Sequence, residues 1–262
     1  MELFCCEMVN SIPTAIYDKA IFGDPRVLAN LLFLEPNYTP RRCFGTVQHL
    51  VEPYMRKIIT TWMLEVSEEH GCEEQVFPLA VNFLDRFLAV CPIKPNQLQL
   101  SATVSLLLAS KVRMCTPLSV HMLSMFTDRS ITPKQIKDWE LLFLSKLQWE
   151  VCGVTGFDFI DHILEGANLV GTCNMLRPHS ITLLALAYTE SDVACIRGSV
   201  LACAALVSAA RGLRMKPDIL NDVCTLIKCD PHDVESIVVR IEVILAECAV
   251  HQTYSDSNSL CL

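Results

Sequence analysis

The side chains best suited to acid–base chemistry in this sequence are His49, the pair Asp161-His162 and a cluster of glutamates. The cluster packs five carboxylates into ten residues, at Glu65, Glu68, Glu69, Glu73 and Glu74. A general acid and base act from a pocket that holds a substrate, and no pattern in the sequence indicates one. A Gly-rich phosphate loop, H-E-x-x-H and G-x-S-x-G are all missing. We therefore interpret the cluster as a solvated helix end and loop, and an enzyme is the less favoured class.

A metal site would need cysteines and histidines at ligand spacing, and the fourteen cysteines include no C-x-x-C pair. Cys224, Cys229 and His232 come closest, but their spacing does not suit zinc and they lie across the start of a predicted helix. No secretory signal is visible, so we expect reduced thiols, many of them small core side chains. The sequence predicts neither a metal nor a cofactor.

Arg56 and Asp85 are charged residues placed among apolar ones. Asp85 follows Leu84 and precedes Phe87 by two residues, and Arg56 lies on a helix face beside apolar side chains. Burying either charge alone is costly, so a mutual salt bridge that joins two helices is the expected arrangement. Two unrelated surface charges are the alternative.

Capping residues, Gly and Pro divide the chain into predicted helices, with almost no alternation typical of strands. The first helix begins at Pro25. The others are expected at 53–70, 77–90, 98–112, 117–126, 133–147, 156–166, 175–188, 199–211, 217–227 and 230–249.

Two stretches, 98–112 and 198–210, combine small and apolar residues on every side and carry no charge except Lys111. A helix of this kind is buried, because no face of it gains from contact with water. The first stretch is too short and too polar to cross a membrane. We therefore predict an all-α protein with two units of about five helices, each wrapped around one buried helix. The expected divisions are an N-terminal segment (1–22), a first domain with its preceding helix (23–150), a second domain (151–250) and a fraying tail (251–262).

Composition limits the partners. The 262 residues are 52% hydrophobic, which supplies ample core for one or two compact units. The net charge of −8 argues against a nucleic-acid binder, which would need a basic face.

Three runs of sequence resemble the first cyclin box of the D-type cyclins. They are MRKIITTWMLEVSEEHGCEEQVFPLAVNFLDRFL (55–88), LQLSATVSLLLASK (98–111) and FTDRSITPKQIKDWELLFLSKLQW (126–149). The resemblance continues through TGFDFIDHIL (155–164) and covers roughly residues 1–250. It implies two tandem five-helix cyclin boxes with an N-terminal helix. The hallmark positions of the family fall on Arg56, Asp85, Leu100, Lys111 and Glu140; the first two form a structural salt bridge, and Leu100 belongs to the central helix.

Lys111 and Glu140 are the charges that interrupt the apolar runs of their helices. In cyclins the equivalent side chains bind around the regulatory C helix of a cyclin-dependent kinase and hold that helix inward. The kinase's own Lys–Glu ion pair can then form and orient ATP. The cyclin acts by population shift, because it binds the active position of the C helix better than the inactive one. The implied partner is cyclin-dependent kinase 4 or 6.

A second surface is expected on the helix that begins at Pro53. Spacings of three and four place one set of side chains on one face, with two more from the central helix beside them: Met55, Ile58, Ile59, Trp62 and Glu65, then Leu98 and Gln99. The resemblance implies a shallow apolar groove for substrate and inhibitor peptides that carry Arg-x-Leu, with Glu65 pairing to the arginine. The same face could instead be core, and for Ile59 both interpretations stand equally.

Leu3, Cys5 and Glu7 form an L-x-C-x-E motif, by which D-type cyclins engage the retinoblastoma pocket. An extended segment places the three side chains on one side, since strand side chains alternate.

The chain also departs from the family. It ends at Leu262 without the acidic, Pro-rich tail that bears a Thr-Pro phosphorylation site, and Thr116-Pro117 and Thr132-Pro133 lie at predicted helix starts. The short form resembles viral D-type cyclins, whereas the L-x-C-x-E motif resembles cellular ones. Arg197-Gly198-Ser199 stands where Pro-Pro-Ser is typical, which affects only local geometry.

The sequence thus predicts a non-enzymatic subunit that activates cyclin-dependent kinase 4 or 6 toward retinoblastoma-family proteins at the G1/S transition, in nucleus and cytoplasm. Inhibitors of the Arg-x-Leu type are further expected partners, and nucleic acid and membranes are not. The alternative with the same fold is a TFIIB-like transcription factor, which also has two cyclin boxes. Such a factor would carry a zinc ribbon and a basic face, and this sequence contains neither. A helical adaptor that activates nothing is the alternative from another class.

Overall fold

The computed structural model describes residues 18–215 and 218–259, except for the side chains of Lys19 and of residues 249–259. The first domain and the helices that precede it in sequence comprise α1 (Lys19–Phe22), α2 (Pro25–Tyr38), α3 (Pro53–Glu69), α4 (Val76–Leu88), the 3-10 turn η1 (Pro95–Gln97), α5 (Leu98–Arg113), α6 (Val120–Phe126) and α7 (Pro133–Lys146). The rest contains α8 (Phe157–Gly166), α9 (Leu176–Thr189), α10 (Gly198–Gly212), α11 (Leu220–Ile227) and α12 (Pro231–Ser259). The predicted all-α class is confirmed, since the described residues hold no strand beyond an isolated bridge between Phe44 and Gln48.

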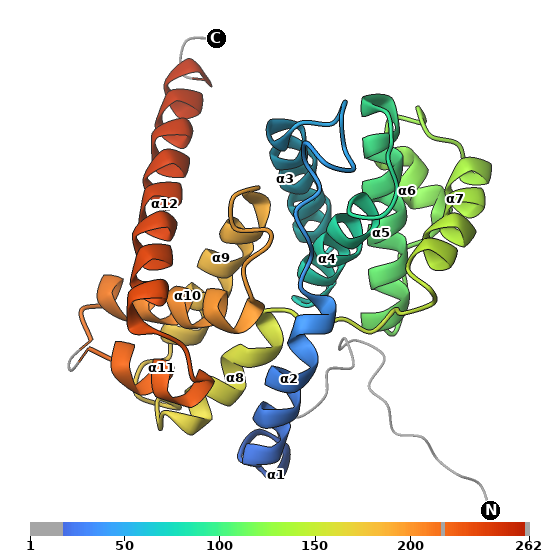
Figure 1. Ribbon diagram of the computed structural model, residues 1–262. Helices are drawn as coiled ribbons and strands as arrows, with labels where there is room; N and C mark the ends of the chain where they lie inside the picture. Colours follow the sequence, from blue (N-terminus) through green and yellow to red (C-terminus); the bar gives the residue numbers. More distant parts are fainter. Residues whose placement is uncertain (1–17, 216–217, 260–262) are drawn as a thin grey trace, which may run out of the picture.

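The two helices predicted to be central are both buried. Every residue from Leu100 to Ser110 in α5 and from Gly198 to Ala210 in α10 is buried. The hydroxyls of α5 need no external partner: Ser105, for example, donates to the carbonyl of Ser101, one turn earlier, at 2.9 Å. α5 packs chiefly against α4 and α7, and α10 packs chiefly against α9 and α12 (Figure 1). Each central helix thereby organises one hydrophobic core.

The helix that precedes the first domain in sequence packs against the second. α2 begins at Pro25, and Asp24 caps it by accepting a hydrogen bond from the backbone N–H of Arg26, as its sequence predicts. Leu28, Leu31 and Leu32 contact the core around α10. In Figure 1, α1 and α2 accordingly lie next to α8.

Some helix ends differ from their predicted positions. α6 begins at Val120 rather than Pro117, because the Ser119 hydroxyl caps it by accepting from the N–H of Met122. Thr116 and Pro117 therefore lie in an exposed loop after α5. α12 continues to Ser259, past the expected end at Ala249. A helix already formed adds one hydrogen bond per residue as it extends, so it can outrun its apolar pattern.

Candidate protein-binding surface

Lys111 and Glu140 meet at the surface of the first domain. Lys111 lies in the last turn of α5, and Glu140 lies in the middle of α7. The Nζ of Lys111 is 2.5 Å from Oε1 of Glu140. Their side chains are 46% and 17% exposed, so both are accessible from outside. An exposed ion pair contributes only about 0–1 kcal/mol to stability, because water screens it. The pair can therefore exchange its internal bond for bonds to another molecule at little cost to the fold.

The elements beneath this pair hold it in place. Ile136 and Phe143 anchor α7 in the core, and Glu140, four residues after Ile136, lies on the same side of the helix, where it reaches the end of α5. At the end of α5, the positive charge of Lys111 also interacts favourably with the helix dipole. Each member of the pair is followed in sequence by an exposed apolar side chain, Val112 and Leu141. Exposed apolar area rimmed by charged groups can mark a protein-binding site, and these two side chains place such area beside the pair.

The predicted salt bridge between Arg56 and Asp85 is present and buried. Two parallel hydrogen bonds form it, from Arg56 Nε to Oδ1 at 2.6 Å and from Nη2 to Oδ2 at 2.7 Å. Burial by itself lowers the pKa of Arg56, but the Asp85 carboxylate outweighs this effect and the net shift of that pKa is upward. The guanidinium therefore stays charged between α3 and α4.

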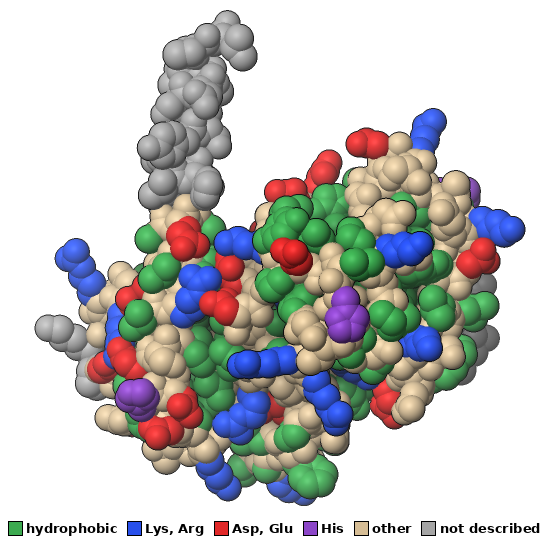
Figure 2. All heavy atoms as spheres, turned by 45° about the horizontal axis from the view of Figure 1, so that its top comes forward, with side chains coloured by type: hydrophobic (Ala, Val, Ile, Leu, Met, Phe, Trp, Pro, Cys, Tyr) green, Lys and Arg blue, Asp and Glu red, His purple; other side chains and the backbone are tan. Residues whose placement is uncertain are grey.

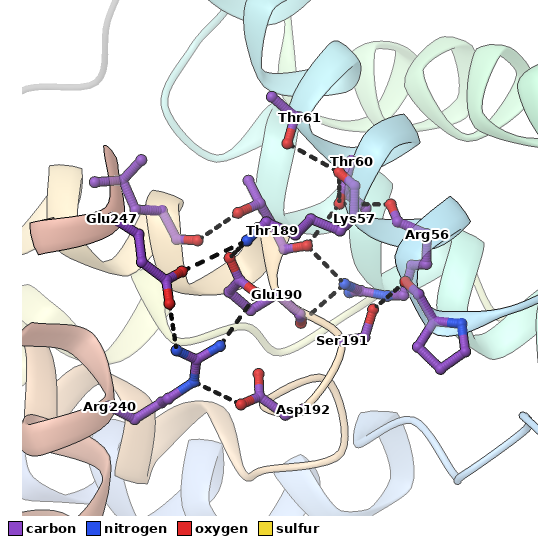
Figure 3. Close-up of polar contacts among 12 residues, drawn as sticks. Arg56, Lys57, Thr60, Thr61, Thr189, Glu190, Ser191, Asp192, Arg240 and Glu247 are labelled. Carbon is purple, nitrogen blue, oxygen red and sulfur yellow. Dashed lines mark hydrogen bonds and ion pairs between the residues drawn. The ribbon is translucent and has the colours of Figure 1, made fainter. Parts of the chain in front are cut away.

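Arg56 has a second role that sequence reasoning missed. Its Nη1 donates to the carbonyl oxygens of Thr189 at 3.2 Å and Glu190 at 2.9 Å, and Thr60 Oγ1 also donates to Thr189 at 2.9 Å (Figure 3). These carbonyls close α9, where a helix leaves its last acceptors without partners. One arginine thus neutralises an aspartate of the first domain and ends a helix of the second. No local pattern could show this, because 133 residues separate Arg56 from Thr189.

An ionic network extends this junction to α12. Glu190 accepts from Lys57 at 2.6 Å and from Arg240 at 3.3 Å, and Arg240 also binds Asp192 at 2.6 Å (Figure 3). The hydrogen bond with Glu190 raises the pKa of Lys57. Because Lys57 belongs to α3 and Arg240 to α12, the network links the two domains.

The apolar face of α3 is only partly open to solvent. Ile58 is 64% exposed, and Met55, Trp62, Gln99 and the exposed Glu65 accompany it. Ile59 and Leu98 are buried, so they support this face from beneath. For Ile59 the core interpretation is therefore correct. Figure 2 brings forward the top of Figure 1, and there hydrophobic side chains reach the surface with acidic ones among them.

The remaining candidate residues do not assemble a catalytic site. Asp161 and Glu74 both bind Arg177, and His162 is buried against Phe22. Leu100 lies in the core, as predicted. Leu3, Cys5 and Glu7 lie outside the described residues.

Among the side chains that the structure describes, which end at Cys248, no three from His, Cys, Asp or Glu converge as metal ligands. Within residues 18–215 and 218–259, no helix has the length and apolarity needed to cross a membrane.

Comparison with known proteins agrees with this architecture. Residues 26–152 match the family described as "Cyclin, N-terminal domain", and residues 154–261 match "Cyclin, C-terminal domain". The chain is 45% identical over 215 residues to G1/S-specific cyclin-D3 of Bos taurus, covering 81% of this chain and 74% of the relative. It is 43% identical over 217 residues to G1/S-specific cyclin-D2 of Gallus gallus, covering 82% and 74%.

A solved structure shares the fold. The crystal structure of a viral cyclin from herpesvirus saimiri superposes with a TM-score of 0.76 at 21% identity, covering 85% of this chain and 97% of that one. The two family matches span both domains, and the identity to relatives extends over most of the chain. The chain therefore belongs to the cyclin family, whose members are regulatory subunits of kinases and not themselves catalysts, and within that family to the D-type cyclins.

Proposed function

We propose that this chain binds and activates a cyclin-dependent kinase of the 4/6 type through Lys111 and Glu140. The observation that carries the proposal is the exposed contact between these side chains, 2.5 Å apart on two helices anchored in one core. The side chains of Lys111 and Glu140 are both charged, and hydrogen bonds made by charged groups are stronger than those between neutral groups. Val112 and Leu141 add apolar area beside them.

The action on the kinase follows from rigidity. α5 is buried along most of its length, so the surface that carries Lys111 is formed before the partner arrives. A pre-formed surface loses little conformational entropy on binding, which leaves more free energy for holding the partner. Once this surface is bound to the regulatory C helix of the kinase, it stabilises the inward position of that helix, in which the kinase's Lys–Glu pair orients ATP.

Substrate choice is the second part of the proposal. Retinoblastoma-family proteins would be engaged by Leu3, Cys5 and Glu7, and Arg-x-Leu segments of substrates or inhibitors by the face of Met55, Trp62 and Glu65. The apolar side chains exposed on this face support the proposal. The complex would act at the G1/S transition, in nucleus and cytoplasm.

The test is co-expression with kinase 4 or 6, followed by co-purification and phosphorylation of a retinoblastoma fragment. Lys111→Glu or Glu140→Lys should abolish both, because each places like charges together and removes a contact to the kinase. The double swap Lys111→Glu with Glu140→Lys restores the internal pair but presents reversed charges to the kinase, so it should fold normally and still fail to bind.

Lys94→Glu is the matched control. Lys94 is exposed at the opposite end of α5 from Lys111, and the same change of charge there should leave binding intact. Full kinase activation by the double swap would contradict the proposal. Binding without activation in the unmodified chain would instead identify an adaptor.

A further inference from the structure

A cavity of about 340 Å³ lies between the two domains, on the opposite side of α3 from the Met55–Trp62 face. Leu64, Ser67 and Glu68 line it from α3. These residues are three and four positions apart, so they share one face of the helix, about half a turn away from Met55, Ile59 and Trp62. A molecule in this cavity would therefore not compete with an Arg-x-Leu segment bound at the face of Met55, Trp62 and Glu65.

The floor of the cavity is apolar and is built by both domains. Phe77 comes from α4 and Phe157 from α8, and both are buried. Ile181 and Ala185 on α9 remain half-buried. The volume is at the lower end of the range of about 300–1,000 Å³ that is usual for ligand pockets. It suits one or two bulky apolar side chains.

The rim is acidic and only partly neutralised. Glu68, Glu73 and Glu74 lie around it. Glu74 is paired with Arg177, but Asp161 also binds that arginine at 2.7 Å, so its charge is shared. Glu68 and Glu73 have no ion pair with any residue that the structure describes. The rim is thus left with uncompensated negative charge beside an apolar floor.

We propose that this interdomain cavity is a second docking site, for a partner segment in which leucine or phenylalanine stands next to lysine. The apolar side chain would leave water by entering between α3 and α9. The lysine ammonium would pair with Glu68 and Glu73, and an acidic segment would be repelled there. Because both domains line the cavity, its occupant bridges them.

The probe is a fluorescein-labelled peptide, Gly-Ser-Phe-Leu-Lys-Lys-Ser-Gly, in which leucine directly precedes lysine and no cation stands two residues before a leucine. Its binding to the full chain is measured by fluorescence anisotropy. The double variant Glu68→Lys/Glu73→Lys should weaken binding at least about tenfold, because it puts like charges together. Ala185→Trp, which fills the cavity without changing charge, should weaken binding to a similar extent. If that variant does not fold by circular dichroism, the rim variant decides alone.

The control is Glu69→Lys, which makes one such charge reversal at an exposed neighbour that does not line the cavity. It should change the affinity less than about twofold. Equal binding of a peptide with both lysines replaced by glutamate would overturn the proposal. So would no binding of the labelled peptide, or an unchanged affinity of the rim variant. Loss of binding in Trp62→Ala would place the peptide on the other face of α3 and also overturn it.

Discussion

Glu35 of α2 binds Ser199 at the start of α10 through both carboxylate oxygens. Oε1 accepts from the backbone N–H of Ser199 at 2.6 Å, and Oε2 accepts from its hydroxyl at 2.8 Å. The glutamate is 1% exposed. The first N–H groups of a helix have no acceptor within it, and its N-terminal end favours negative charge. A helix from the beginning of the chain therefore caps the central helix of the second domain.

Replacing Glu35 should destabilise the second domain. Glu35→Ala leaves a buried N–H and a buried hydroxyl without acceptors, at a cost of about 1–3 kcal/mol for an unsatisfied group. Urea unfolding followed by circular dichroism measures the loss. Glu242→Ala, at an exposed position on α12, is the control and should change the free energy of unfolding by less than about 0.5 kcal/mol. Equal stability of the two variants would show that this cap contributes nothing.

The contact between Gly198 and Gly156 should not accept a side chain. A Cβ on Gly198 would lie 2.6 Å from the backbone nitrogen of Gly156, and backbone there cannot move aside easily. Gly198→Ala is therefore expected to cost about 1–3 kcal/mol through overpacking.

Gly212 provides the comparison, because it lies at the other end of α10 with nothing within 4 Å of its Cβ position. Gly212→Ala should be neutral or slightly stabilising, since alanine has the higher helix propensity. Thermal unfolding of the two variants separates the outcomes. A similar melting temperature for both would refute the steric argument.

Replacing Arg56 should lower the free energy of unfolding more than Glu35→Ala or Gly198→Ala. Arg56→Met leaves Asp85 buried without its cation and removes the donors to Thr189 and Glu190. Loss of one partner from a buried pair costs about 3–5 kcal/mol. Arg56→Lys should recover only part of this, because an ammonium cannot form the two parallel bonds. Chemical denaturation that found Arg56→Lys as stable as the unmodified chain would contradict this account.

Arg211 should make stability depend on acid pH. Its hydrogen bonds to Glu235, at 2.7 and 2.9 Å, lower the pKa of that carboxyl below the ordinary 4.5. In this pH range the folded state then binds fewer protons than the unfolded state. The stability that the Arg211–Glu235 pair contributes is therefore present above the pKa of Glu235 in the unfolded state, and it is lost as the pH falls through the pKa of Glu235 in the folded state.

Arg211→Gln should therefore flatten the decline of the unfolding free energy below pH 4.5, measured by urea titration at a series of pH values. Arg214→Gln is the control, since Arg214 is exposed nearby and forms no ion pair within the described residues. Identical pH profiles for the two variants would exclude the Arg211–Glu235 pair as the cause.

Local patterns in the sequence were sufficient for the helical architecture. Burial of α5 and α10 follows from the absence of charge on every face, and the capping box at Thr132 and Gln135 marks the start of α7 as predicted. The Arg56–Asp85 bridge was also predictable, because two charges in apolar surroundings must compensate each other. Each of these inferences needs only neighbours in sequence or a general cost of burying charge.

Tertiary packing decided which distant groups meet. The sequence placed Arg56 beside Asp85 but could not show that α9 ends on the same guanidinium, or that Glu35 would cap a helix 164 residues later. It also left Ile59 undecided between core and surface, which the packing of α3 settles as core. These contacts depend on how two separately predictable domains are oriented. That orientation arises from complementary shapes and charges far apart in the chain, which helical periodicity and capping signals do not encode.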